Sequence, residues 1–242
     1  MWHGAWIITC GVIVRVGAGE VWDDFVAYTV AQGWYGAENL SWIPGEVGAS
    51  AVQNIGAYGA EVKDAISVVE YFDTNKLDVV RLSCEECGFG YRESVFKHQL
   101  RGVAIILAVE FRLHRTPTPN LGYGDVIKEV EARGGATLKN IREAICAIRA
   151  SKLPDPKELG NAGSFFKNPI VAKEVADRLL DEYPSMPHYP ATNGEDGVER
   201  VKLAAGWLID KAGMKGYKEG NVGVHERQAL VLVSLGGATG GE

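Results

Sequence analysis

The chain has 242 residues, 46% of them hydrophobic and 23% charged, which is typical of a globular protein with one large core or two small ones. Its formal net charge of -6 argues against a general nucleic-acid binder, so an anionic ligand would need a local cluster of Lys and Arg. The sequence has no apolar run of membrane-spanning length and no signal-peptide pattern at its start, so we expect a cytoplasmic protein.

Two elements are predicted near the N-terminus. Residues 12–16 are short and β-branched, which favours a strand. Residues 22–30 place apolar side chains and Thr29 on one helical stripe, and Gly33 can close that helix.

A segment rich in glycine and small residues follows at 43–59, Ile-Pro-Gly-Glu-Val-Gly-Ala-Ser-Ala-Val-Gln-Asn-Ile-Gly-Ala-Tyr-Gly. Such a loop can close its backbone N–H groups around a phosphate or a cofactor ring. It matches neither of the common nucleotide-binding patterns, so motif rules do not identify the ligand. Taken alone, it is also compatible with a bulged loop.

The next segment predicts a hairpin and a core strand. Residues 67–72 and 77–82 flank a polar turn, and residues 103–113 form the strongest core strand of the chain. Between them, Tyr91 and Arg92 follow a glycine. An arginine there can grip a carboxylate or phosphate, or it can form an ordinary surface ion pair.

A proline-rich break at 116–119 separates the two halves of the sequence, and Tyr123 lies in a turn after it. The second half predicts more helix than the first. We expect helices over 137–150, 171–180 and 201–212, a loop over 186–190 and a last strand over 229–235.

The stretch 160–169, Gly-Asn-Ala-Gly-Ser-Phe-Phe-Lys-Asn-Pro, combines small, aromatic and polar residues. Its glycines allow a close approach to the backbone, its two rings can exclude water, and Ser164 and Asn168 remain as polar groups. The pattern predicts a small polar-tipped pocket. The alternative is a tight turn with a half-buried aromatic pair.

The cysteines give weak evidence for a metal or redox site. Cys84 and Cys87 form a single C-x-x-C, with no second pair or His cluster and no thioredoxin-type helix after it. We interpret the cysteines as reduced thiols and expect no metal.

Several of these stretches together resemble one family, the UDP-N-acetylenolpyruvoylglucosamine reductases (MurB), flavoenzymes of peptidoglycan precursor synthesis. The matching stretches lie in the family's order, from about residue 11 to the end of the chain. They are residues 43–59, Phe-Gly-Tyr-Arg-Glu-Ser-Val-Phe-Lys at 89–97, Lys-Leu-Pro-Asp-Pro-Lys at 152–157, 160–169, Leu-Ala-Ala-Gly-Trp-Leu-Ile-Asp at 203–210, and Gln-Ala-Leu-Val-Leu at 228–232. The loop with Tyr189 resembles the longer-loop type, in which a tyrosine covers the substrate channel.

The resemblance implies a UDP-N-acetylmuramate dehydrogenase with bound FAD and NADPH as co-substrate. In the family, the reduced flavin gives hydride to UDP-N-acetylglucosamine enolpyruvate, an enzyme group adds a proton, and UDP-N-acetylmuramate is released. Ser164 falls at the proton donor and Arg92 at the group that neutralises the developing carboxylate charge.

The resemblance also implies two sets of ligand contacts. Those to FAD fall on Gly48, Ser50, Gln53, Asn54 and Gly56. Those to the UDP-sugar fall on Tyr91, Tyr123, Lys152, Asn168, Tyr189, Lys215 and Gln228, with Lys215 at the diphosphate. For each single contact, the alternative is ordinary packing or solvation.

The implied fold class is α+β. An FAD-binding domain of the PCMH/vanillyl-alcohol-oxidase type, without its N-terminal lobe, would occupy residues 1–115, a connector with a helix 116–153, and a smaller α+β substrate-binding domain 154–242. The family has a phosphate-binding lobe before residue 11 and a catalytic glutamate beyond residue 242, so the chain reads as truncated at both ends. We therefore expect the chain by itself to bind FAD poorly and to turn over slowly or not at all. We also expect a monomer.

Other functions stay open at this point. The chain could be an inactive or weakly active fragment that retains only nucleotide-sugar binding. A different flavoprotein oxidase with the same FAD-binding architecture is a further possibility, although it would lack the pair Arg92 and Ser164.

Overall fold

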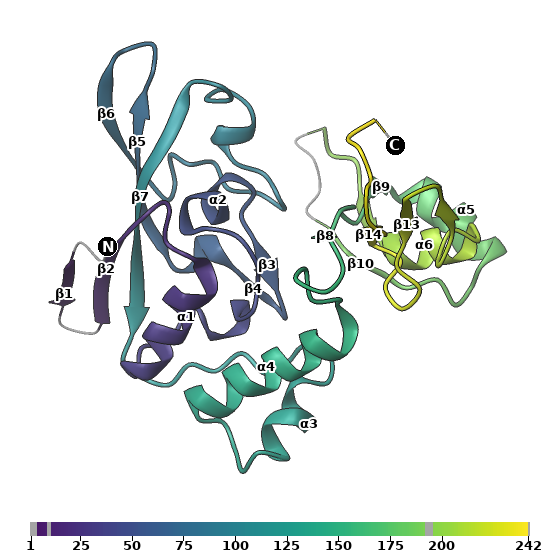
Figure 1. Cartoon of the computed structure of the whole chain (residues 1–242), viewed down its shortest axis with the longest axis horizontal. Coiled ribbons are helices and arrows are strands. Elements are labelled where there is room, and N and C mark those ends of the chain that lie inside the picture. Colours follow the sequence, from purple (N-terminus) through teal and green to yellow (C-terminus); the bar gives the residue numbers. More distant parts are fainter. Residues whose placement is uncertain (1–3, 9–10, 192–195, 242) are drawn as a thin grey trace. The chain divides into compact units, whose positions relative to one another are not determined.

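The structure is a computed structural model, and it describes residues 4–8, 11–191 and 196–241. The chain divides into two compact units, Met1–Arg149 and Ala150–Glu242 (Figure 1). Each unit has its own sheets and its own core, as an α+β protein of this length should have.

A five-stranded antiparallel sheet forms the centre of the first unit, in the order β1-β2-β7-β5-β6 (Figure 1). The strands are β1 (Gly4–Ile8), β2 (Gly11–Gly17), β5 (Ile66–Asp73), β6 (Asp78–Ser83) and β7 (Ala104–His114). The predicted strand, hairpin and long core strand are all confirmed, whereas β1 was not expected.

One face of this sheet carries the core. Val12, Val14 and Val16 alternate along β2 and are buried, as a half-buried strand requires. Helix α1 (Trp22–Ala31) covers this face with Trp22, Phe25, Val26 and Thr29 of the predicted stripe, whereas Val30 is half-buried. The ring centroids of Phe25 on this helix and Phe111 on β7 are 4.6 Å apart, so helix and sheet share one aromatic core.

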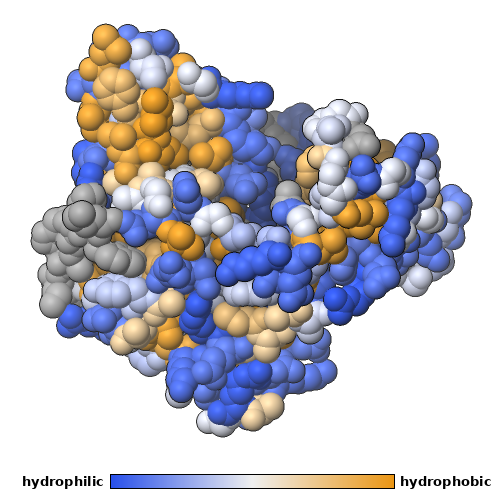
Figure 2. Space-filling model, in the orientation of Figure 1, coloured by the Kyte–Doolittle hydropathy of each residue, from blue (hydrophilic) through white to orange (hydrophobic). Residues whose placement is uncertain are grey.

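The other end of β5, β6 and β7 presents apolar side chains to solvent. Val79, Ile105 and Leu107 are exposed there, as is Leu77 in the hairpin turn. Figure 2 shows apolar surface gathered over these strands. The core strand is therefore buried mainly along its second half, which its apolar first half, residues 104–109, did not reveal.

The glycine-rich segment folds into short regular elements. Residues 47–52 form helix α2 (Val47–Val52), and the hairpin of β3 (Gly56–Ala57) and β4 (Ala60–Glu61) follows. The segment is thus not the continuous loop that its glycines suggested. Three 3₁₀ turns complete the connections: η1 (Glu38–Leu40), η2 (Val62–Asp64) and η3 (Val95–Lys97).

Two helices end the first unit. Helix α3 (Val126–Glu131) was not predicted, whereas α4 (Leu138–Lys152) confirms the helix expected over 137–150. Its buried residues are Leu138, Ile141, Ala144, Ile145 and Ile148. The backbone N–H of Asn140 donates to the Thr137 hydroxyl, as expected for a capping residue. The last residues of α4 belong to the second unit.

The second unit contains two small antiparallel sheets, in the orders β10-β11-β9 and β12-β13-β14-β8. Their elements are β8 (Asn161–Ser164), β9 (Ile170–Ala172), α5 (Lys173–Glu182), β10 (His188–Pro190), β11 (Arg200–Leu203), α6 (Ala205–Lys211), β12 (Lys218–Glu219), β13 (Val222–Val224) and β14 (Val231–Ser234).

Three predictions for this unit were wrong in part. The helix expected over 201–212 is strand β11 followed by the shorter α6, the loop at 186–190 contains β10, and Val171 belongs to β9 instead of α5. Short β-branched runs pair with neighbours that sequence alone does not reveal, and tertiary pairing outweighs helical periodicity there.

Candidate functional site

The glycine-rich segment is held by a buried asparagine. Asn54 is 0% exposed and has a positive φ of 44°, a conformation that asparagine tolerates better than most residues. Its Nδ2 donates to the carbonyl of Gly90 at 2.8 Å, and its Oδ1 accepts from the Lys63 backbone N–H at 3.1 Å. The side chain thus joins the segment to the turn before Arg92.

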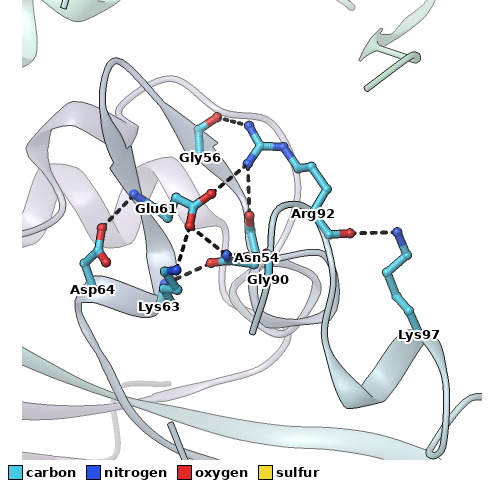
Figure 3. Close-up of polar contacts among 8 residues, drawn as sticks. All are labelled: Asn54, Gly56, Glu61, Lys63, Asp64, Gly90, Arg92 and Lys97. Atoms are coloured by element: carbon cyan, nitrogen blue, oxygen red, sulfur yellow. Dashed lines mark hydrogen bonds and ion pairs between the residues drawn. The ribbon is translucent and has the colours of Figure 1, made fainter. Parts of the chain in front are cut away.

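The Arg92 side chain also binds the glycine-rich segment (Figure 3). Its Nη1 donates to the Asn54 carbonyl at 3.1 Å, and its Nη2 donates to the Gly56 carbonyl. Its Cζ lies 5.2 Å from the ring centroid of Tyr91. The guanidinium therefore binds the glycine-rich segment within its own unit, which makes it more than a surface ion pair.

A carboxylate that sequence reasoning missed lies at the centre of this cluster. Glu61 Oε2 accepts from Asn54 Nδ2 at 3.1 Å and lies 3.1 Å from Lys63 Nζ, and its Oε1 lies 3.9 Å from Arg92 Nη1. The Glu61 side chain also accepts from the Asp64 backbone N–H. No motif spacing marks Glu61, because its partners come from three separate segments.

Two of the residues predicted to contact FAD, Gly48 and Ser50, already have partners within the first unit. A Cβ at Gly48 would lie 2.7 Å from that of Ala18, so this glycine allows close backbone packing. The buried Ser50 hydroxyl donates to the Val47 carbonyl at 2.6 Å. Gln53 is exposed, and its amide can both donate to and accept from a flavin ring edge.

Gly56 also allows close packing within the first unit. A Cβ there would lie 2.7 Å from Arg92 Nη1 and 3.0 Å from the Ala60 carbonyl oxygen. The absence of a side chain lets the guanidinium reach the backbone. Of the side chains predicted to contact FAD, that of Gln53 is exposed, whereas those of Ser50 and Asn54 are buried, and the close approaches at Gly48 and Gly56 are to other parts of the chain.

Tyr58 and Tyr123 extend this region. Their rings are 6.0 Å apart and perpendicular, and Tyr123 is half exposed. Burial raises the pKa of Tyr58, against the effect of Arg149, which forms a hydrogen bond with it. Burial also lowers the pKa of Arg149, whose Nε donates to the Trp42 carbonyl at 3.0 Å.

Ser164 is exposed at the end of β8, where it pairs with Val231 of β14. The neighbouring Phe165 and Phe166 form an edge-to-face pair 5.2 Å apart, but they are 62% and 43% exposed. The prediction that these rings exclude water is therefore wrong for this unit by itself. The stretch is a strand end followed by exposed rings.

A cavity of about 580 Å³ lies beside this strand end. Phe165, Tyr217, Val222, Val224 and Leu232 are among its lining residues, so its wall is mostly apolar. Ser164 is not part of the lining. The predicted polar-tipped pocket is thus replaced by an apolar hollow next to the serine.

The remaining sugar-contact predictions fall at varied places in the second unit. Asn168 Oδ1 accepts from the backbone N–H of Ala205, the first residue of α6, at 2.9 Å. Lys215 Nζ lies 3.2 Å from Asp210 Oδ2. Tyr189 is 41% exposed, with Lys202 Nζ 5.8 Å from its ring centroid. Lys152 is exposed and Gln228 is half-buried.

The structure brings together Asn54, Gly56, Tyr91 and Arg92 in the first unit. The two residues of the predicted catalytic pair belong to different units: Arg92 lies in the first and Ser164 in the second. The roles of all these residues stay predictions.

The three cysteines that the structure describes, Cys84, Cys87 and Cys146, are buried or partly buried free thiols, and Cys10 lies outside the described residues. Burial raises the pKa of the Cys87 thiol to about 12, and burial also raises the pKa values of Cys84 and Cys146. Among the described residues, no group of three or more His, Cys, Asp or Glu side chains could hold a metal ion. In the same part of the chain, every helix is too short or too polar to cross a membrane.

Two family models match the chain. One describes an FAD binding domain and matches residues 3–82, and the other describes the C-terminal domain of UDP-N-acetylenolpyruvoylglucosamine reductase and matches residues 155–242. The first contains the glycine-rich segment, and the second contains Ser164.

Curated relatives named UDP-N-acetylenolpyruvoylglucosamine reductase match almost the whole chain. The relative from Chromobacterium violaceum is 55% identical over 233 residues, which cover 95% of this chain and 67% of the relative. Those from Neisseria meningitidis serogroup C and Bacteroides fragilis are each 52% identical over 231 residues, covering 65% and 68% of the relatives. The chain thus spans about two thirds of the length of the relatives it matches.

A solved structure agrees with the sequence relatives. The crystal structure of UDP-N-acetylenolpyruvylglucosamine reductase from Thermus caldophilus has a TM-score of 0.62 and 26% identity, and it covers 93% of this chain and 62% of that chain. The predicted fold class is confirmed: an α+β chain with an FAD-binding domain followed by the C-terminal domain of the reductase family. The chain belongs to the UDP-N-acetylenolpyruvoylglucosamine reductase family.

Proposed function

We propose that this chain carries out the NADPH-dependent, FAD-mediated reduction of UDP-N-acetylglucosamine enolpyruvate to UDP-N-acetylmuramate. The observation that carries the proposal is identity of 52–55% to reductases of that name across nearly the whole chain. This observation favours a reductase over a fragment that only binds nucleotide sugars.

Arg92 has the chemistry to stabilise negative charge on the substrate carboxylate. Hydride addition to an enolpyruvyl double bond places charge on the adjacent carboxylate, and hydrogen-bond donors aimed at that charge lower the barrier. A guanidinium has five N–H donors, so Arg92 can hold two loop carbonyls and still offer donors to a carboxylate. FAD, when bound, would supply the hydride.

Ser164 is our candidate for the proton donor. A serine hydroxyl is a weak acid, so it can protonate only a strongly basic carbon held close to it and shielded from water. Its exposure in the second unit is compatible with direct access to a ligand.

The ligand contacts follow the two units. Gln53, Asn54, Gly56 and their neighbours would hold FAD, as the match to an FAD binding domain supports. Lys215 would bind the diphosphate of the UDP-sugar, and the other predicted sugar contacts would surround it. The monomeric state, the cytoplasmic location and the domain limits at 115 and 153 also stay predictions.

The two half-reactions test this proposal. The chain is loaded with excess FAD, reduced by NADPH without oxygen and mixed with the enolpyruvyl UDP-sugar, while flavin absorbance is followed. We expect substrate-dependent reoxidation and formation of UDP-N-acetylmuramate. Reduced flavin that does not respond to the substrate would contradict the proposal.

Ser164→Ala separates the proton donor from the rest of the site. We expect unchanged flavin reduction by NADPH and reoxidation by the substrate slowed about 10²–10⁴-fold. Ser185→Ala is the matched control, because Ser185 is also an exposed serine of the second unit. Equal slowing of both half-reactions in the Ser164 variant would exclude the proton-donor role.

A further inference from the structure

Two hydrogen-bond donors and two cations surround the carboxylate of Glu61. Figure 3 shows three of them: the Asn54 amide, which donates at 3.1 Å, and the Lys63 ammonium and Arg92 guanidinium, which form ion pairs at 3.1 and 3.9 Å. The Asp64 backbone N–H also donates to the Glu61 side chain. The Glu61 side chain is 27% exposed, so solvent screens these contacts only in part. It is the acceptor that joins β4, the glycine-rich segment and the Arg92 turn.

The backbone around Glu61 is held in unfavourable conformations. Asn54 and Arg92 both have positive φ, 44° and 58°. Such a conformation costs about 1–2 kcal/mol for a residue such as arginine and less for asparagine. Side-chain hydrogen bonds hold both residues: the Asn54 amide contacts the Gly90 carbonyl and the Lys63 N–H, and Lys97 Nζ donates to the Arg92 carbonyl at 2.8 Å. Strain of this kind persists only where the surrounding contacts determine the geometry.

The direction of the Arg92 side chain depends on this arrangement. Its two donors to Asn54 and Gly56 orient the fork, and the Glu61 carboxylate beside Nη1 offsets part of its charge. Without that carboxylate, a flexible arginine side chain would sample other rotamers and lose preorganisation.

We propose that Glu61 is a positioning residue that orients the Arg92 guanidinium against the glycine-rich segment and so directs its remaining donors at the carboxylate of the substrate. The proposal rests on the proposed function, because it takes that ligand to be the enolpyruvyl carboxylate. Glu61 acts through Arg92 and needs no contact with the substrate.

The test compares Glu61→Gln with wild type in two measurements. The first is the NMR spectrum of isotope-labelled arginine side chains, in which restrained guanidinium groups give separate Nη signals. We expect Arg92 to show them in wild type and to lose them in Glu61→Gln. The second is binding of the enolpyruvyl UDP-sugar, which we expect to weaken about tenfold through the loss of a charge-assisted arrangement.

Two controls isolate the effect. Glu129→Gln removes the carboxylate from another Glu–Arg pair of the same unit, with Arg133 at 2.6 Å, and should change neither measurement. Asp64→Asn disturbs the reciprocal hydrogen bonds around η2 while leaving the Glu61 carboxylate in place, and should keep the Arg92 signals.

Each result decides a separate question. Unchanged Arg92 signals and unchanged binding in Glu61→Gln would overturn the proposal. If that variant does not fold, Glu61→Asp takes its place, because its shorter side chain keeps the charge but cannot reach all four of the groups around the Glu61 carboxylate. Binding by Glu61→Asp should weaken about threefold, and wild-type affinity would overturn the proposal. Failure of the wild-type chain to bind the substrate would contradict the proposed function, whereas the arginine spectra would still decide the role of Glu61.

Discussion

The two compact units differ in how firmly their own contacts hold the candidate site residues. In the first, Asn54 is fully buried and Arg92 is bound to two backbone carbonyls. In the second, Ser164 is exposed and Phe165 is 62% exposed. The half of the proposed site with the glycine-rich segment is therefore built by its own unit, while the half with the serine lies on the surface of its unit.

The hydrophobic core of the first unit is also larger than that of the second. The first unit has an aromatic centre, in which Trp22, Phe25 and Phe111 contact one another with centroid distances of 4.6–5.8 Å. The buried cluster described for the second unit consists of Ala176, Met186 and Leu203. A larger core with interlocking rings should hold its attached loops more rigidly than a small one.

The largest expected effect is on this aromatic core. Phe111→Ala should lower the free energy of unfolding by about 3–5 kcal/mol, because it leaves a cavity beside Phe25 and Trp22. Phe165→Ala should change it by less than about 0.5 kcal/mol, since that ring is mostly exposed. Urea unfolding measures both values. Similar losses in the two variants would refute the contrast between the units.

The next effect concerns an ion pair between α1 and α4. Asp23 accepts from Arg142 Nη1 and Nη2 at 2.7 and 2.8 Å, and both side chains are largely buried. Asp23→Asn should cost about 1.5–3 kcal/mol of unfolding free energy near neutral pH, as expected for a charge-assisted hydrogen bond. Chemical denaturation of both proteins gives the difference.

The same pair predicts a pH dependence with a definite sign. Burial acts to raise the pKa of Asp23, but the hydrogen bonds from Arg142 and the Trp42 N–H outweigh it and lower that pKa below its usual 3.8. The stabilisation is thus complete above the unfolded-state pKa and is lost as the pH falls through the folded-state pKa. The difference between wild type and Asp23→Asn should shrink below about pH 4. A constant difference across that range would contradict the assignment.

A smaller loss is expected where Arg92 approaches the backbone. Gly56→Ala would place a Cβ 2.7 Å from Arg92 Nη1 and should cost about 1–3 kcal/mol through overpacking. Gly19→Ala is the matched control, because a Cβ there has no described atom within 4 Å. Thermal unfolding and FAD titration of both variants are the measurements. Equal unfolding temperatures and equal FAD affinities for the two variants would show that moving the guanidinium away from Gly56 destabilises neither the fold nor FAD binding.

The smallest effect lies in the second unit. Lys211 Nζ is 5.4 Å from the ring centroid of Trp207, an exposed cation–π contact. Lys211→Gln should reduce the unfolding free energy by at most about 0.5–1 kcal/mol. Denaturant unfolding would detect a larger loss, which would mean that this unit is held by its surface contacts more than its core indicates.

The fold was predictable where local pattern and burial agree. The alternating valines of β2 and the helical stripe of α1 and α4 carry their own periodicity. The helix expected over 201–212 was wrong in its first part, because β11 pairs with β9 and β10. Strands of three or four residues are too short to show a period, and their partners lie far away in the sequence.

The residues of the candidate site were also predictable from the sequence only in part. The sequence resemblance placed Asn54, Gly56 and Arg92, and the structure shows them in contact. It did not indicate Glu61, since convergence of donors from three segments exists only after folding. The exposure of Phe165 and Phe166 also could not be predicted, because an aromatic pair next to a serine has the same sequence whether its rings are covered or not.

The position of β7 has a consequence for the order of events during synthesis. β7 is the last of the five strands to leave the ribosome, yet it lies between β2 and β5 and pairs with both. Gly11 pairs with His114, so the sheet cannot close until more than a hundred residues have been made. At about 5–20 residues per second, β2 and the β5–β6 hairpin wait for seconds with unpaired edges. The unpaired strand edges of such a nascent chain can bind chaperones or aggregate before the folded surface that would bind a cofactor has formed.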